Sequence, residues 1–156
     1  PRQSLRWVEA VPVTDLRFVS VSWTVAFPDA ASRAAWVRAK PPDYVGHLLG
    51  HEGEGSLQSL LKRRGLANHV TAGVSVDEEN FSVLRVGVDV TPEGLSRRDE
   101  VVAAVFAVLE RLRQGIPDYI FKECQDLSRI RWRFAEKRPA SSWVLELVDR
   151  MREFGP

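Results

Sequence analysis

Residues 43–73 decide the fold of this chain, and they read DYVGHLLGHEGEGSLQSLLKRRGLANHVTAG. Apolar residues recur there at spacings of three and four, which predicts one helix from about Asp43 and a second helix from Ser56. A glycine-rich bend separates the two helices, and an alternating strand follows the second one. Two of the three histidines and two glutamates lie between His47 and Gly55, so we expect any chemistry of the chain to concentrate at this bend.

Alternation of apolar and polar residues predicts three β-strands. They cover residues 18–27, 66–76 and 84–90. The second and third runs flank a polar turn, which is typical of an antiparallel hairpin. We interpret residues 30–40 as a connector anchored by Trp36, and residues 5–8 as a candidate edge strand.

Helical periodicity fills the second half of the chain. Residues 91–93 begin one long helix that Gly115 ends, because proline suits the first helical turn and glycine the position after the last. Pro117 begins the next helix, and Ser141 caps a final one. Early strands and late helices indicate an α+β domain, an antiparallel β-sheet covered by α-helices on one face. The residues expected to face inward from these helices are Val102, Val105, Phe106, Leu109 and Leu112, then Ile120, Cys124, Leu127 and Phe134, then Trp143, Val144, Leu147, Val148 and Met151.

The composition describes one ordinary globular unit. With 44% hydrophobic and 28% charged residues, residues 1–156 are expected to form a single domain with its own core, in which each of the five tryptophans packs. The formal charge is 22 − 21 = +1, so no strong attraction to nucleic acid or to an anionic membrane is expected. No apolar run approaches the ~18 residues of a membrane span. The single cysteine, Cys124, rules out an internal disulfide and favours a reducing compartment such as the cytoplasm.

His47 and His51 are spaced four residues apart, and two histidines on one helical face can bind zinc. Hydrolytic zinc motifs read His-Glu-x-x-His or His-x-x-Glu-His, whereas here Glu52 follows the second histidine. Glycines interrupt the helix at this point, Glu123 is expected to be solvated, and no third ligand is evident. The sequence therefore predicts neither a catalytic residue nor a metal ligand, and a metal site at the two histidines would require zinc in the isolated chain.

Peptide binding at the bend is a second interpretation. A glycine-rich bend exposes backbone N–H and C=O groups and permits close approach of another chain. The strand through residues 70–72 could offer its edge to an extended peptide, which would add as a further strand. Glu52 would then pair with the amino terminus of that peptide. The alternative is a structural role, in which His47 and His51 only fill the bend between two helices.

The stretch at residues 43–73 also resembles part of a known protein family. The block GHLLGHEG at residues 46–53, followed by Gly65 and by Ala72-Gly73, closely resembles the insulysin/pitrilysin family of zinc metallopeptidases, in the second domain of its N-terminal half. Nardilysin belongs to the same group. Further stretches agree in order over nearly the whole chain, namely VPVTDLR at 11–17, VDVTPEGL at 88–95, FKECQDLSRIRWRF at 121–134 and Arg138-Pro139.

The resemblance implies a parent enzyme with four homologous α+β domains in two halves that enclose a chamber. Its zinc cofactor binds to a His-x-x-Glu-His motif in the first domain, and that motif is absent from this sequence. The chain lacks an initiator methionine and ends on Gly155-Pro156, so we expect it to be one non-catalytic domain of a much larger peptidase.

The resemblance also implies an exosite, a surface that anchors the amino-terminal end of a substrate peptide away from the catalytic zinc. The positions that match it are His47, Gly50, Glu52, Val70, Thr71 and Ala72. Ala72 stands where the family typically has glycine, and its methyl group is expected to shift or weaken peptide binding. The implied partners are peptide substrates and the other domains of the parent. The alternative is a purely structural or partner-binding domain of a catalytically silent or nardilysin-like relative.

Overall fold

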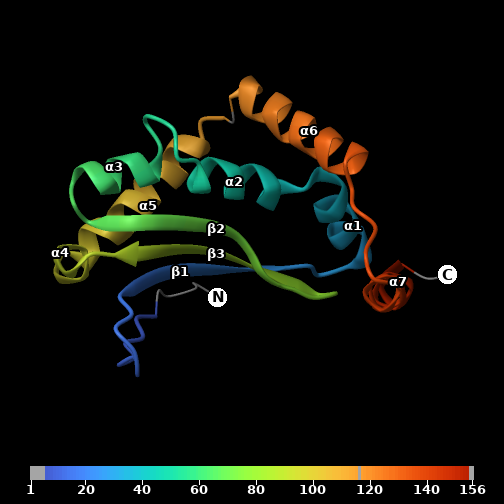
Figure 1. Cartoon of the computed structure of the whole chain (residues 1–156), viewed down its shortest axis with the longest axis horizontal. Helices are drawn as coiled ribbons and strands as arrows, with labels where there is room; N and C mark the ends of the chain where they lie inside the picture. Colours follow the sequence, from blue (N-terminus) through green and yellow to red (C-terminus); the bar gives the residue numbers. More distant parts are fainter. Residues whose placement is uncertain (1–5, 116, 155–156) are drawn as a thin grey trace.

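The computed structural model describes residues 6–115 and 117–154, which form a three-stranded antiparallel sheet and seven helices (Figure 1). The strands are β1 (Phe18–Ala26), β2 (Ala67–Asp77) and β3 (Phe81–Val90), in the order β1-β3-β2. The predicted α+β class, the first strand and the antiparallel hairpin of β2 and β3 are therefore confirmed. Within the candidate edge strand at 5–8, residue 5 lies outside the described residues and the other three form no strand.

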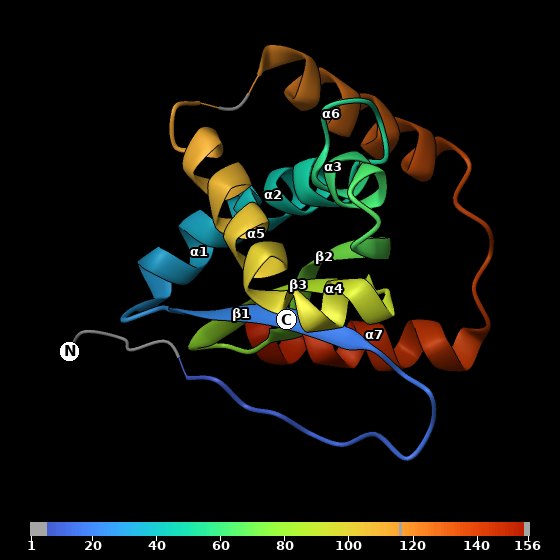
Figure 2. The same cartoon turned by 90° about the vertical axis from the view of Figure 1, so that its left-hand side faces the viewer.

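Several helices cover one face of the sheet, and the last two helices form the C-terminal part of the chain (Figure 1). They are α1 (Ala30–Ala39), α2 (Pro41–Gly50), α3 (Leu57–Arg63), α4 (Pro92–Ser96), α5 (Arg98–Leu112), α6 (Asp118–Arg133) and α7 (Ala140–Phe154). Figures 1 and 2 show α2, α3 and α5 on the same side of the sheet, with α6 beyond α2. None of the described helices is both long enough and apolar enough to cross a membrane.

The core lies between the sheet and these helices. Val88 of β3 is paired with Val19 of β1 on one side and with Val70 of β2 on the other, so all three side chains share one face. Leu57 and Leu61 of α3 are fully buried in the same cluster. Side chains alternate between the two faces of a strand, so the polar positions of these strands lie on the opposite face.

Helix α1 corrects the interpretation of residues 30–40 as a connector. The Asp29 carboxylate accepts a hydrogen bond from the Ser32 N–H at 2.7 Å, which satisfies a free donor of the first helical turn. The segment that follows is rich in alanine, the strongest helix former, and contains neither glycine nor proline. Trp36 packs against Phe27 with ring centroids 5.5 Å apart, so it anchors a helix.

Two helices, α4 and α5, replace the single long helix that was predicted from residues 91–93. The backbone at Arg97 has φ −107° and ψ 34°, which is not helical and separates the two. A Cβ built on Gly94 would lie only 1.8 Å from the carbonyl oxygen of Leu66, so α4 is held against the start of β2 by a contact that only glycine permits. The chain therefore ends α4 at Ser96 and begins α5 at Arg98.

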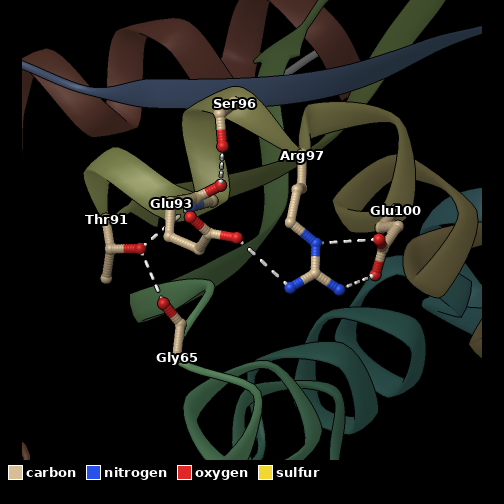
Figure 3. A network of polar contacts seen from close by, with 7 residues as sticks. Gly65, Thr91, Glu93, Ser96, Arg97 and Glu100 are labelled. Carbon is tan, nitrogen blue, oxygen red and sulfur yellow. Dashed lines mark hydrogen bonds and ion pairs between the residues drawn. The ribbon is translucent and has the colours of Figure 1, made fainter.

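A polar network holds this junction (Figure 3). The Thr91 hydroxyl donates to the carbonyl oxygen of Gly65 at 2.7 Å, which ties the start of α4 to the end of α3. The Arg97 guanidinium lies between two carboxylates, 2.7 Å from Glu100 and 3.4 Å from Glu93. The side chain of Arg97 therefore links α4 to α5 across the break between the two helices.

The apolar stripe of α7 lies in solvent, which corrects the expectation that it faces inward. Trp143 is 52% exposed and Val148 is 56% exposed. Trp7 and Trp132 are exposed as well, so a core position is wrong for three of the five tryptophans. In α6, Ile120 is buried whereas the predicted inward residues Leu127 and Phe134 are exposed. Periodicity shows which face of a helix is apolar, but it does not show what covers that face.

We expect Asp77→Asn to lower the free energy of unfolding by about 1–2 kcal/mol at pH 7, a range discounted because the aspartate is half-exposed. The buried Arg33 guanidinium of α1 makes two hydrogen bonds to this carboxylate, at 2.8 and 3.0 Å. These bonds hold the pKa of Asp77 below its usual value. The stabilisation is therefore complete above the unfolded pKa of about 3.9 and is lost as the pH falls through the lower folded pKa.

Urea unfolding of both proteins from pH 7 down to pH 2 measures this dependence. The difference between them should shrink below about pH 4, where protonation removes the interaction in the natural chain as well. Arg38→Ala, an exposed arginine on the same helix, is the control and should change stability by less than about 0.5 kcal/mol. A difference that stays constant down to pH 2 would contradict the assignment.

Candidate functional site

A hollow of about 360 Å³ lies between α2, the outer strand β2 and α6. It contains two of the predicted site residues, His47 and Ala72, together with Cys124. Its lining residues are Pro42, Asp43, Gly46, His47, Ala72, Gly73, Val74, Cys124, Leu127, Ser128 and Arg131. Two other hollows of 350–390 Å³ are bordered mainly by α5 or by α6 and include none of the predicted residues. We therefore call the first one the β2-edge pocket.

The outer edge of β2 forms one wall of this pocket. The Val70 N–H donates to the Gln58 side-chain oxygen at 2.9 Å, on the side away from β3. Alternate residues of a strand direct their N–H and C=O groups to the same side, so those of Ala72 also point outward. No strand among the described residues pairs with this edge. The outward backbone groups that follow Val70 therefore have no strand partner among the described residues, although those of Ala72 face the glycines of α2.

Helix α2 approaches this edge through its glycines. A Cβ on Gly46 would stand 3.1 Å from the carbonyl oxygen of Ala72, and one on Gly50 would stand 3.9 Å from the Ala72 nitrogen. Any larger side chain at Gly46 would push the helix away from the strand. Gly50 therefore lies beside Ala72, as the resemblance implies, although it does not line the pocket.

Glu52 is coupled to the same strand by Gln58, a residue that the sequence did not single out. Gln58 is 2% exposed, and its hydrogen bond is the main reason why the pKa of Glu52 is lowered, with Lys62 and His69 contributing. The Glu52 carboxylate is therefore ionised at neutral pH. The sequence did contain a signal for this role. Gln58 lies among the apolar residues of α3, and a buried amide needs hydrogen-bond partners.

The sequence predicted a solvated Glu123, but in the structure its carboxylate lies beside His47. Its Oε2 atom is 3.1 Å from His47 Nε2, without the alignment of a hydrogen bond. The rings of His47 and His51 meet edge to face with centroids 5.7 Å apart. One potential ligand atom from each of the three residues lies within 4.8 Å of the others. The third ligand that the sequence did not reveal comes from α6, more than 70 residues further along.

Cys124 lies on the wall of the β2-edge pocket and is half-buried. Burial is the largest cause that raises the pKa of its thiol, and the nearby carboxylates of Asp43 and Glu123 add to it. A thiol with a raised pKa is a poor nucleophile at neutral pH. The structure therefore offers no activated cysteine at this site.

The remaining predicted residues are distributed unevenly around the pocket. Val70 is 1% exposed and its N–H is already bonded to Gln58. The Thr71 side chain is on the opposite face of the sheet, where its hydroxyl donates to the Gly87 carbonyl oxygen at 3.4 Å. The N–H and C=O of Thr71 point toward β3, so of these two residues only the Val70 carbonyl can take part in binding at the outer edge.

Comparison with known proteins assigns this fold to a class of peptidase domains. The structure is similar to the crystal structure of pitrilysin, with a TM-score of 0.78 and 27% sequence identity over 90% of this chain and 15% of that chain. A nardilysin-like protein of Arabidopsis thaliana is 38% identical over 89% of the chain, and an insulin-degrading enzyme of Drosophila melanogaster is 36% identical over 94%. The chain spans 14% of the length of each of these two relatives.

Residues 6–127 match the profile of the peptidase M16 inactive domain. The chain therefore belongs to the M16 peptidase family, and the resemblance that the block at 46–53 carries is confirmed. The domain with which it aligns is the inactive one, not the one that carries out catalysis.

We expect Gln58→Leu to lower the free energy of unfolding by about 1–3 kcal/mol, because the leucine fills the space but leaves the buried Val70 N–H without an acceptor. Chemical denaturation measures the loss. Gln125→Leu, on the exposed face of α6, is the matched control and should stay within about 0.5 kcal/mol of the natural chain. Equal stability of the two variants would show that Gln58 does not carry this bond.

Proposed function

We propose that this domain anchors the amino-terminal end of peptide substrates for a larger zinc metallopeptidase of the M16 family. The main observation is the β2-edge pocket, in which an unpaired strand edge is open beside the imidazole of His47. A concave site of a few hundred Å³ beside an unpaired strand fits an extended peptide that adds to the sheet.

The backbone of the edge supplies the contacts that do not depend on peptide sequence. Pairing would begin after Val70, because the Val70 N–H is occupied, and would use the outward N–H and C=O of Val74, since α2 faces those of Ala72. The Ala72 methyl packs against the core cluster and does not lie across the edge. On this proposal, the alanine in place of the family's glycine would not by itself block the edge.

The negative charge of Glu52 supports a peptide orientation in which the amino terminus lies at this residue. Glu52 is exposed and its pKa is lowered, so it carries a full negative charge at neutral pH. A peptide amino terminus is protonated under these conditions, since its pKa is near 8. Glu52 is thus suited to pair with that amine, while the rest of the peptide extends along the strand.

The bond cleavage itself would occur elsewhere in the parent enzyme. This sequence contains no His-x-x-Glu-His motif, and it spans only about one seventh of its relatives. In the parent, a zinc ion bound to another domain would supply the activated water. Holding the far end of the peptide would place a distant bond at that zinc, so binding energy is used for orientation. We infer that the chain alone does not cleave peptides. We also infer that the parent acts in the cytoplasm, because the single cysteine favours a reducing compartment.

We predict that a peptide with a free amino terminus protects Cys124 from alkylation by iodoacetamide, because both would occupy the β2-edge pocket. Protection should rise with peptide concentration and should weaken at least several-fold when the peptide is acetylated at its amino terminus. Mass spectrometry of the single cysteine gives the rate directly. A free-amine peptide that binds without slowing the reaction of Cys124 would place the site elsewhere.

The charge of Glu52 is tested in the same assay. Glu52→Gln should weaken protection several-fold, and in the parent enzyme it should raise KM for short peptides with little change in kcat. Glu54→Gln, an exposed acid in the same bend, is the control and should behave as the natural chain. An unchanged KM together with an unchanged kcat for Glu52→Gln counts against the anchoring role.

The second candidate function is a structural or partner-binding domain, and the apolar stripe of α7 favours it. Trp143, Val144 and Leu147 are 43–56% exposed on one helical face, and large exposed apolar patches mark contact surfaces. In the intact peptidase we expect this face to contact a neighbouring domain. Both functions can belong to one domain, since α7 does not line the β2-edge pocket.

For this surface we predict that the isolated chain associates with itself as its concentration rises, because the face has no cover. Sedimentation velocity should show less association for Trp143→Ser combined with Leu147→Ser. Asp149→Asn, on the same helix, is the control. A monomer at every concentration, for the natural chain and the variant alike, would argue against a contact surface on α7.

A further inference from the structure

We propose that His47, His51 and Glu123 form a binding site for a divalent transition metal of the zinc type. The site joins the end of α2 to α6, and it is separate from the His-x-x-Glu-His motif that this chain lacks. The proposal does not rest on the anchoring function, although His47 also lines the β2-edge pocket.

The spacing of the three side chains suits a metal ion. In a tetrahedral zinc site with bonds of about 2.0–2.1 Å, neighbouring ligand atoms stand about 3.3 Å apart. His47 Nε2 and Glu123 Oε2 are already 3.1 Å apart. The atom offered by His51 is within 4.8 Å of both, so a side-chain rotation that moves it by up to about 1.5 Å completes the geometry.

His47 Nε2 is the atom that most needs a partner. It is buried and makes no hydrogen bond, although the histidine ring as a whole is 21% exposed. A buried polar atom without a partner costs about 1–3 kcal/mol. Its neighbour Glu123 carries acceptor oxygens, and no lysine or arginine in the described part of the chain forms an ion pair with that carboxylate. A cation between the two groups would satisfy both.

The ligand set indicates the kind of ion. Two imidazoles and one carboxylate are a known zinc set that leaves a fourth position for water. Calcium and magnesium prefer sites made of oxygen atoms, so they fit this set less well. His51 Nδ1 now accepts a hydrogen bond from the Gly53 N–H at 2.9 Å. Coordination through that nitrogen would release the Gly53 N–H to solvent at the exposed bend, at a cost of about 1 kcal/mol.

Metal binding would have a structural consequence for α6. Most of the apolar residues of this helix are exposed, and its contacts to α2 include the stacked rings of Tyr44 and Phe121 at 5.9 Å. Coordination by Glu123 from α6, by His47 from α2 and by His51 just after α2 would cross-link the two helices at one wall of the β2-edge pocket. Because the folded chain presents the three ligands together, bound metal stabilises it.

The test is a titration of the chain with Zn²⁺ after removal of metal by a chelator, followed by calorimetry and thermal unfolding. We expect one Zn²⁺ per chain with a micromolar or lower Kd and a rise in Tm of several degrees. Co²⁺ in its place should give the visible absorption of a tetrahedral site. His51→Gln and Glu123→Gln should each weaken binding at least tenfold, with an unchanged circular dichroism spectrum.

The control is His69→Gln, the one histidine outside the cluster, which should bind Zn²⁺ as the natural chain does. Absence of stoichiometric binding up to 100 µM Zn²⁺ overturns the proposal. Equal affinity of Glu123→Gln and the natural chain also overturns it, because the third ligand would then have no role. Peptide protection of Cys124, measured in the presence of a chelator, reports on anchoring alone, so the two proposals fail separately.

Discussion

Helix α2 lies close against the outer strand of the sheet through two glycines. A Cβ on Gly46 would stand only 3.1 Å from the carbonyl oxygen of Ala72, and Gly50 faces the Ala72 nitrogen. Leu49, between them, is fully buried and holds the helix in the core. The rest of the site depends on this contact, since it brings the bend that follows α2 to the edge of β2 and directs the histidines toward α6.

The polar residues at this edge are arranged around one buried amide. Gln58 accepts from the strand and lowers the pKa of Glu52, so the position of that carboxylate is tied to the backbone of β2. A buried amide of this kind is costly unless its groups are bonded. The ionised glutamate and the outer edge of β2 are therefore linked through one side chain.

The two terminal helices have a different character. In α6, Ile120 is buried and Glu123 faces His47, while Phe134 near its end is exposed. Helix α7 presents a whole apolar face to solvent. This chain spans 14% of the length of the two relatives compared above, and we propose that, in a parent of similar length, such faces pack against neighbouring domains. The sheet with α2, α3 and α5 supplies the core cluster, whereas α6 and α7 provide mainly exposed surfaces.

The sequence by itself determined the α+β class, the three strands, the α2–α3 pair and the family, because periodicity and the block at 46–53 are local patterns. It did not reveal α1, whose N-cap lies within an apparent connector, or the break at Arg97, which follows the close contact of Gly94 with Leu66, a residue far from it in sequence. Only the tertiary structure placed Glu123 beside His47 and the Gln58 side chain within hydrogen-bonding reach of Glu52. Contacts between elements distant along the chain are set by how helices pack on the sheet, and a local pattern carries no record of that packing.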